Sequence, residues 1–240
     1  MMREAIHAYA VMHQGDWSKI AKSIIEKTPY CSVPSRFSYV TIVDEEYPDP
    51  FRKLRFPPWI LYYEGDLSLI KRKTLGIVGS RKLCLYAEDV TVRLVKANQD
   101  KVIVSGLAKG ADTKAHEAAL EQGTIGVLGC GLDVAYPKEN RWLIETMKKH
   151  HLVMSEYPEG TKPLKHHFPW RNRLIACLSE SVVAVQAQRK SGTATTIMEA
   201  IQLSKPVYAV PYPLDFEDGQ GCNWLISQGA QILLSADEKI

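Results

Sequence analysis

The sequence feature that most constrains the fold is a regular alternation that starts near Lys73 and continues to the end of the chain. Short runs rich in Val, Ile and Leu alternate with longer segments in which apolar residues recur at helical spacing. We predict strands at residues 59–65, 75–80, 101–105, 124–129, 151–155, 181–186, 206–210 and 230–234. This alternation predicts an α/β fold in which helices cover both faces of a parallel sheet.

The residues before this alternation have a different pattern. Residues 1–28 are predicted to form two short helices, with Asp16 as the N-cap of the second. A segment this short buries too little surface to fold alone, so we expect it to dock on something else, either the main domain or a partner. Proline recurs from Pro29 to Pro58 and predicts extended or turning backbone. We therefore expect a helical N-terminal segment at 1–40 and a main domain at 41–240.

Composition limits the kind of protein this is. The 240 residues include 30 Lys and Arg against 27 Asp and Glu, a net charge of +3, so any basic surface must be local. No apolar stretch approaches the roughly 18 residues of a membrane span, and the N-terminus lacks a signal sequence core. We therefore expect a cytoplasmic protein with no membrane partner. The cysteines are scattered, form no CxxC pair and are expected to be reduced thiols: Cys31, Cys84, Cys130, Cys177 and Cys222.

Loops that follow the predicted strands are the expected place for a ligand, because the carboxyl ends of parallel strands open a crevice. The first such loop contains Gly79, Ser80 and Arg81, where backbone N–H groups, a helix N-terminus and a guanidinium suit an anion. A tight turn with an exposed arginine is an equally open alternative. In the next loop Gly106 permits close backbone approach, and Asp112 is expected to cap the helix that follows.

The usual motifs of nucleotide-dependent and hydrolytic enzymes are missing. No G-x-G-x-x-G follows any predicted strand, and no P-loop, G-x-S-x-G or H-E-x-x-H motif occurs. His166 and His167 are adjacent and therefore cannot share one face of a regular element, and His116 is expected to be a packing residue. We expect no catalytic residues, no metal site and no cofactor.

One basic and aromatic stretch, KHHFPWRNRLIACLSE at 165–180, stands out. We expect a helix to begin near Arg171, which places Lys165 and Phe168 on the preceding loop and Arg173 in the first turn. Cations beside an exposed ring suit single-stranded nucleic acid, because charge follows the phosphates and bases stack on the ring. A solvated helix start is the alternative, and it explains the charges but not the ring.

Six motifs occur in an order that resembles the DNA-processing protein DprA (Smf) family, over roughly Tyr47 to Leu234. They are GIVGSR, SGLAKGADTKAHEAAL, GVLGCGLDVAYPKEN, SEYPEGTKP, FPWRNRLIACLS and GCNWLISQGA. The resemblance implies an extended Rossmann-like, doubly wound, mostly parallel sheet with a short N-terminal helical appendage. It further implies a bacterial, cytoplasmic homodimer that binds single-stranded DNA without catalysis and loads the recombinase RecA during natural transformation.

The resemblance also implies site residues. The family's DNA pocket falls on Arg81, Gly160, Lys165 and Phe168, which the crevice and stacking arguments select in part as well. Lys138 and Arg141 are weaker candidates for a basic track that leads onward. The full expected set of nucleic-acid-binding residues is Gly79, Ser80, Arg81, Gly106, Gly160, Lys165, Phe168, Arg171 and Arg173.

Several positions depart from the family pattern. Ala111 takes the place of the isoleucine in a motif that commonly reads GID, and Gln186 takes the place of the glutamate in one that reads VVEA. The stretch SGTATT replaces SGSLIT, and Tyr212 replaces a glycine. The loss of a carboxylate at Gln186 is expected to alter hydrogen bonding in the pocket. The family's N-terminal helical domain is expected to be reduced to residues 1–28, and no winged-helix module is expected beyond Ile240.

Two other interpretations remain open. A nucleotide-processing enzyme of the lysine-decarboxylase-like or phosphoribohydrolase kind carries PGGxGTxxE, but here Thr196 occupies the position of the catalytic acid and Glu199 lies three residues further on. A scaffold that contacts only proteins is the third interpretation. Dimerisation is expected through residues 223–234. Trp224 and Leu225 belong either to this interface or to the hydrophobic core, and the sequence leaves both possibilities open.

Overall fold

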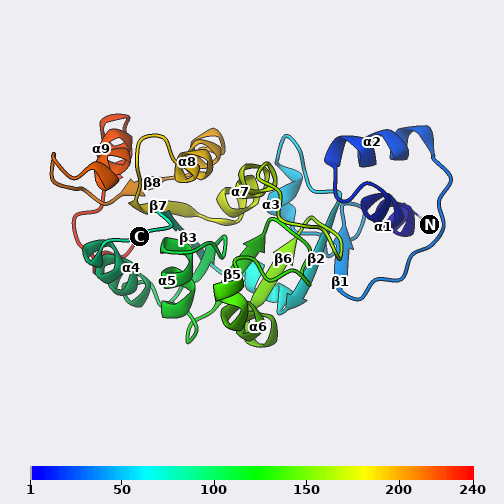
Figure 1. Cartoon of the computed structure of the whole chain (residues 1–240), viewed down its shortest axis with the longest axis horizontal. Coiled ribbons are helices and arrows are strands. Elements are labelled where there is room, and N and C mark those ends of the chain that lie inside the picture. Colours follow the sequence, from blue (N-terminus) through cyan, green and yellow to red (C-terminus); the bar gives the residue numbers. More distant parts are fainter. Residues whose placement is uncertain (1) are drawn as a thin grey trace.

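The computed structural model describes residues 2–240, which form a nine-stranded sheet in the order β1-β2-β6-β5-β4-β3-β7-β8-β9 (Figure 1). The strands are β1 Ser38–Thr41, β2 Ile60–Gly65, β3 Thr74–Gly79, β4 Val102–Ser105, β5 Thr124–Leu128, β6 Leu152–Ser155, β7 Ser181–Gln186, β8 Val207–Ala209 and β9 Gln231–Ile232. Every predicted strand is confirmed, with ends that differ by at most two residues. β1 was missed because its surroundings are rich in proline.

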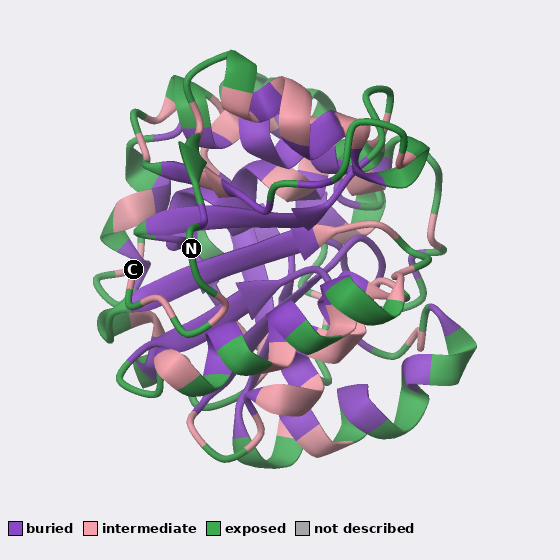
Figure 2. Ribbon diagram, turned by 90° about the vertical axis from the view of Figure 1, so that its left-hand side faces the viewer, coloured by how far each residue is buried: buried purple, intermediate pink, exposed green. Residues whose placement is uncertain are grey.

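Helices cover both faces of this sheet. They are α1 Met2–Met12, α2 Trp17–Glu26, α3 Asp49–Arg52, α4 Leu85–Ala97, α5 Ala111–Ala118, α6 Arg141–His150, α7 His167–Leu178, α8 Gly192–Gln202 and α9 Gln220–Ser227, with short 3-10 turns η1 Leu67–Lys71, η2 Lys138–Asn140 and η3 Glu217–Gly219. α4, α5 and α6 lie on one side of the sheet, and α7 and α8 lie on the other (Figure 1). Buried strands run between layers of helices with exposed outer faces (Figure 2). The predicted α/β class is therefore confirmed.

The order of the strands reverses once. From β3 the chain moves outward through β4, β5 and β6, and it then returns so that β7 pairs with the other side of β3. β3 pairs parallel with β4 and with β7, and β8 pairs parallel with β7 and with β9. β2 pairs antiparallel with β6 and with β1. Connections that leave adjacent strands in opposite directions open a crevice at their carboxyl ends, here between β3 and β7.

Two hydrophobic clusters hold the layers together. All six positions of β7, Ser181–Gln186, are buried, as expected for a parallel strand covered on both faces. The second cluster joins Ile6, Tyr9 and Ile20 of the N-terminal helices to residues such as Tyr62 of the sheet. Of the two open alternatives, the structure shows docking on the main domain for the described residues of this segment, which exclude residue 1. The expected boundary at residue 40 falls inside β1, and the division into two units stays a prediction.

The short helices begin and end where the sequence indicated. Gly15 lies between α1 and α2 with a φ of +78°, and the Asp16 carboxylate accepts a hydrogen bond from Lys19 N at 3.0 Å. Trp17, the first residue of α2, donates from its indole to the Pro57 carbonyl at 2.7 Å. Within residues 2–240, no helix combines the length and apolar character needed to cross a membrane.

His116 gives a testable link between burial and pH. The side chain is fully buried on α5, its Nδ1 lies 2.6 Å from Thr124 Oγ1, and burial lowers its pKa to about 3. In the unfolded chain the histidine is protonated below about pH 6.5, whereas in the folded protein it stays neutral down to about pH 3. Between these pH values the unfolded state binds more protons, so the free energy of unfolding falls as the pH falls.

We predict that His116 alone lowers the free energy of unfolding by about 1 kcal/mol between pH 6.5 and 5.5. Urea denaturation of the unmodified protein and of His116→Gln at both pH values measures this contribution. The variant should lose less stability on acidification than the unmodified protein. Equal losses in the two proteins would contradict the prediction.

Candidate nucleic-acid interface

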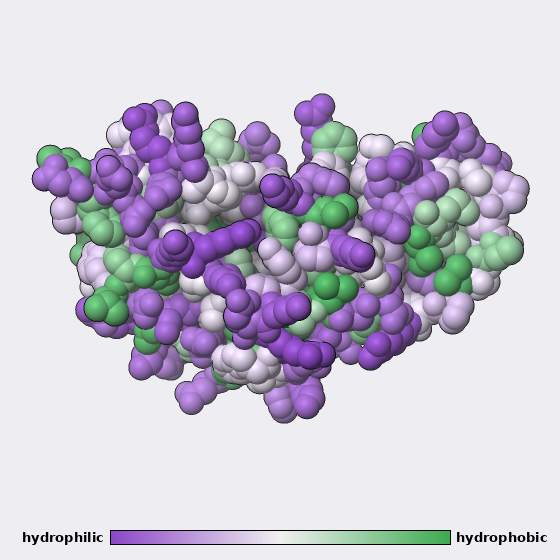
Figure 3. Space-filling model, viewed as in Figure 1, coloured by the Kyte–Doolittle hydropathy of each residue, from purple (hydrophilic) through white to green (hydrophobic). Residues whose placement is uncertain are grey.

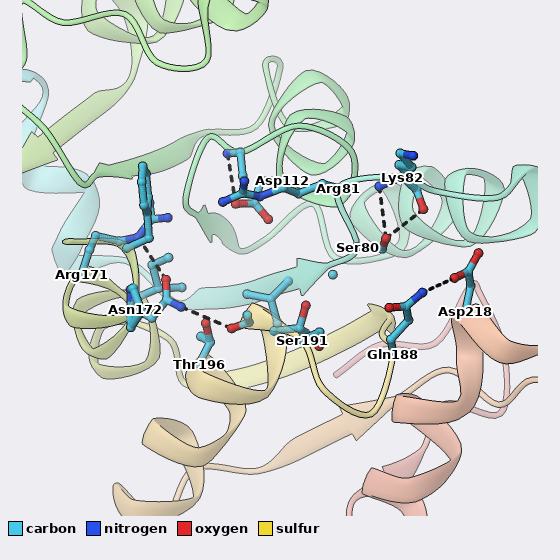
Figure 4. Close-up of a pocket in the computed structure, with 18 residues that line it drawn as sticks. Ser80, Arg81, Lys82, Asp112, Arg171, Asn172, Gln188, Ser191, Thr196 and Asp218 are labelled. Atoms are coloured by element: carbon cyan, nitrogen blue, oxygen red, sulfur yellow. Dashed lines mark hydrogen bonds between the residues drawn. The ribbon is translucent and has the colours of Figure 1, made fainter. Parts of the chain in front are cut away.

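A cavity of about 440 Å³ opens between the loops that follow β3 and β7. Its walls come from segments far apart in sequence, and Figure 4 shows Ser191 and Thr196 at the start of α8 facing Arg81 and Asp112 across this space. The residues that line it include Gly79, Ser80, Arg81, Lys82, Asp112, Phe168, Arg171, Asn172, Ser191, Gly192, Thr193 and Thr196. The crevice predicted at the strand ends is therefore present.

Hydrogen bonds from the end of β7 fix the loop after β3, and the cations of this loop lie at the surface. Ser80 N donates to the Gln186 carbonyl at 2.7 Å, and Ser80 Oγ accepts from Lys82 N at 3.1 Å. The buried Gln186 side chain accepts from Cys84 N at 2.9 Å and donates to the Lys82 carbonyl at 3.2 Å. A carboxylate has no proton to donate to this carbonyl, so the bond from residue 186 to Lys82 depends on the amide of Gln186. Arg81 and Lys82 are both exposed.

The loop after β4 packs directly on this first loop. Gly110 has a φ of +75°, and a Cβ there would lie 2.3 Å from the Ser80 carbonyl oxygen, so only glycine fits. Asp112 was expected to cap α5, but this expectation is wrong. Its carboxylate instead reaches back into the preceding loop and accepts from Gly106 N at 3.1 Å and Ala108 N at 3.2 Å. Burial raises the pKa of Asp112.

Arg171 lies beneath the cavity and not at its rim. Only 4% of the residue is exposed, and its Nη1 donates to the carbonyl of Gly106 at 2.6 Å and to that of Val127. A Cβ at Gly106 would lie 2.5 Å from this guanidinium, so glycine leaves the room that Arg171 occupies. Its Nε donates to Asn172 Oδ1 at 3.1 Å, and its charge lies in the cavity floor and not on an exposed edge as expected. A phosphate contact of Arg171 stays a prediction.

Arg173 is also placed in the interior. It is 4% exposed, and its two terminal nitrogens donate to the two Glu156 carboxylate oxygens at 2.6 Å each. The guanidinium lies 4.2 Å from the centroid of the Trp170 ring. Successive residues of a helix are about 100° apart, so Arg173 faces away from the side of α7 that carries Arg171. The expectation of a phosphate contact is corrected for Arg173, because the carboxylate already occupies these donors.

Phe168 and its neighbours form a partly exposed group of rings and cations. Phe168 is half-buried, and α7 starts at His167, one turn earlier than predicted, so the ring lies in the first helical turn. Its centroid is 5.4 Å from that of Tyr136 and 5.8 Å from Arg81 Cζ. Lys165 is exposed in the turn immediately before the helix. The structure thus brings Arg81 and Phe168 together. Lys165 precedes Phe168 by three residues but is absent from the residues that line the cavity, so its part in binding stays a prediction.

Other predicted positions lie apart from this group. Gly160 is exposed in a turn with a φ of +77°, its N–H donates to Asp133 Oδ1 at 2.9 Å, and it is absent from the residues that line the cavity. Lys138 and Arg141 are exposed at the start of η2 and α6. Their part in binding stays a prediction.

Sequence reasoning missed several candidates near the rim. Tyr136 is 38% exposed beside Phe168, and Lys109 lines a small hollow of about 50 Å³ that continues from the same ring. Arg189 and Lys190 are exposed in the loop after β7. The signal for all four was available, since each lies in a loop that follows a predicted strand. Among residues 2–240, no group of three His, Cys, Asp or Glu side chains is arranged to hold a metal ion.

Comparison with known proteins gives one consistent relationship. The family model described as DNA recombination-mediator protein A matches residues 38–240. The DNA processing protein DprA of Streptococcus pneumoniae is 39% identical over 206 residues, which are 85% of this chain and 73% of that protein. The DNA processing protein DprA of Bacillus subtilis is 40% identical over 204 residues, 83% of this chain and 69% of that protein.

Solved structures agree with this relationship. The X-ray structure of the Streptococcus pneumoniae protein superposes with a TM-score of 0.80 at 38% identity, over 92% of this chain and 76% of that one. The DNA processing protein A of Helicobacter pylori superposes with a TM-score of 0.76 at 35% identity, over 85% and 94%. That structure is described as giving insights into the unique single-stranded DNA binding mode of the Helicobacter pylori protein.

The buried ion pair between Glu156 and Arg173 gives a prediction about stability. Glu156→Gln leaves the Arg173 charge buried without a carboxylate and should lower the free energy of unfolding by about 3–5 kcal/mol. The matched control is Glu159→Gln, which removes an exposed partner 3.6 Å from Arg36 and should change stability by less than about 1 kcal/mol. Urea denaturation measures the free energy of unfolding of both variants. Equal losses in the two variants would contradict the buried character of the Glu156–Arg173 pair.

Proposed function

The chain belongs to the DNA recombination-mediator protein A family, and on that premise we propose that it binds single-stranded DNA at the crevice between β3 and β7. The observation that carries the proposal is the half-buried Phe168 ring at the mouth of the cavity, with the Arg81 guanidinium 5.8 Å from its centroid. A base stacks on such a ring, while the neighbouring cation holds the backbone of the same nucleotide.

Three exposed cations supply the phosphate contacts in this proposal: Arg81 and Lys82 after β3, and Lys165 before α7. Arg171 adds a buried positive charge below them, with its Nε and Nη1 already engaged within the protein. Each neutralised phosphate lowers the slope of log affinity against log salt by about 0.7 for single strands. Binding should therefore weaken steeply as salt is added.

Stacking supplies the other part of the binding free energy. A base on an aromatic side chain is worth about 1–3 kcal/mol, and every base has such a face, so this interaction does not select a sequence. Tyr136, 5.4 Å from Phe168 between ring centroids, offers a second ring beside the first. Paired bases cannot insert in this way, and preference for unpaired DNA follows.

We further propose that the protein acts without catalysis, in the cytoplasm, and passes bound DNA to RecA. The enzyme alternative requires a carboxylate at the position of Thr196, a buried residue that lines the cavity. The two carboxylates among the lining residues are otherwise engaged, since Asp112 accepts backbone N–H groups and Asp218 accepts from Gln188 at 2.6 Å. Incubation with nucleoside monophosphates should release no free base.

Assembly as a homodimer is also part of the proposal. β9 is the last strand of the sheet, with both residues exposed, and Leu234 just beyond it is 85% exposed. Unpaired strand edges with apolar side chains favour pairing between chains. Leu225 is buried, which supports its alternative assignment to the core, whereas Trp224 is half-buried.

The DNA site is tested by separating charge from stacking. We predict that Arg81→Ala and Lys165→Ala each reduce the magnitude of the salt slope by about 0.7, because each removes one phosphate contact. Phe168→Ala should weaken binding by about 1–3 kcal/mol and leave the slope unchanged. Fluorescence anisotropy with oligothymidylate at several salt concentrations measures both quantities.

The control for these variants is Lys96→Ala, which removes an exposed cation in the last turn of α4, where the chain has returned to the amino ends of the parallel strands. It should bind like the unmodified protein. Unchanged affinity of Arg81→Ala, or equal affinity for duplex and single strand, would refute the proposed site.

The dimer is tested separately. Leu234→Asp places a charge at the exposed edge beside β9 and should shift the protein toward monomer in sedimentation velocity at micromolar concentration. The matched control Leu85→Asp changes another leucine with 85% exposure, far from β9 in sequence, and should leave the dimer intact. A monomeric unmodified protein would contradict the proposed assembly.

A further inference from the structure

A second cavity, of about 360 Å³, lies on the other side of the first turn of α7. We call it the N-terminal cavity and define it by His13, Trp17, Lys19, His166, His167 and Trp170, which are among its lining residues. One wall belongs to the turn between α1 and α2 and to the start of α2, and the other belongs to the start of α7. The N-terminal segment therefore forms part of a cavity that also borders the stretch KHHFPW.

The walls of the N-terminal cavity are rich in rings. Trp17 and Trp170 are both half-buried, and each contacts Phe56, with centroid distances of 5.2 and 5.6 Å. His167 stacks on Tyr157 at 4.0 Å, so its position is fixed. A volume of 360 Å³ lies within the range of about 300–1,000 Å³ that is typical of ligand pockets, and it is enough for a nucleobase.

Positive charge borders the cavity at two places. The Lys19 side chain is 67% exposed, and its Nζ lies 3.8 Å from the Asp16 carboxylate. An exposed pair of this kind contributes little, so Lys19 is free to contact a phosphate instead. The first turn of α7, all of it described, contains no acidic residue, and the positive end of the helix dipole lies there beside Lys165.

The two cavities border different sides of the first turn of α7. Phe168 lines the first cavity and its neighbour His167 lines the second. A helix with its side chains is about 10–12 Å across. Single strands carry one phosphate per about 3.4 Å when stacked, so this separation corresponds to about three nucleotides.

From these observations, and resting on the proposed function, we infer that the N-terminal cavity is a second base-binding subsite for the same DNA strand. A base about three nucleotides from the one on Phe168 enters between Trp17 and Trp170, and Lys19 contacts its phosphate. The N-terminal helices thereby lengthen the DNA site in addition to stabilising the fold. Short oligonucleotides occupy the Phe168 subsite alone, and longer ones occupy both.

The experiment compares two charge reversals on the same helix. Lys19→Glu changes a residue that lines the N-terminal cavity, whereas Lys22→Glu changes an exposed lysine one turn away that pairs with Glu26 at 3.8 Å. Anisotropy is measured with oligothymidylates of 4 and 12 nucleotides. Lys19→Glu should weaken the 12-mer roughly five- to tenfold relative to Lys22→Glu and leave the 4-mer unchanged.

A second measurement does not depend on charge. A 12-mer with one 5-iododeoxyuridine, placed at each position in turn, is photocrosslinked to the unmodified protein and the attached peptide is identified. Crosslinks to residues 13–19 should occur at positions about three nucleotides from those that crosslink to Phe168.

The outcomes separate this inference from the proposed function. If the unmodified protein binds neither oligonucleotide, the proposed function and the inference are both overturned. If it binds both, but Lys19→Glu equals Lys22→Glu on the 12-mer and no crosslink reaches residues 13–19, only the second subsite is overturned.

Discussion

The reversal of strand order between β3 and β7 is the constraint on which the rest of the structure depends. It places the loop that carries Arg81 opposite the start of α8 and leaves a cavity between them. Arg171 then holds this arrangement in place, because its guanidinium donates to carbonyls at Gly106 and Val127, where β4 and β5 end. α7 is thereby attached to the sheet edge, and Phe168 in its first turn is held at the mouth of the cavity.

The roles of the positively charged side chains in this region differ with their burial. Arg171 and Arg173 are buried and hold carbonyls and a carboxylate, so they stabilise the scaffold. Arg81 and Lys165 come from loops, are exposed, and remain available for a ligand. A net charge of only +3 therefore says little about the surface. On the face shown in Figure 3, hydrophilic residues dominate the middle and hydrophobic ones form small separate groups.

The N-terminal helices are integrated with the main sheet and are not an isolated appendage. Ile6, Tyr9 and Ile20 pack in one cluster with residues of β2, β6 and α6. Trp17 extends this contact through Phe56 to Trp170 on α7, close to the proposed DNA site. Any change in this ring cluster therefore acts on the position of α7, and the fold and the site cannot be altered independently here.

The sequence by itself determined the strands, the crevice at their carboxyl ends and the loop positions of Arg81 and Lys165, because strand runs and loop positions are local patterns. Only the tertiary structure decided that Arg171 and Arg173 are buried and that Tyr136 lies beside Phe168. An arginine looks the same in sequence whether it meets a phosphate or a buried carbonyl. Its environment depends on the helix start and on partners that are distant along the chain.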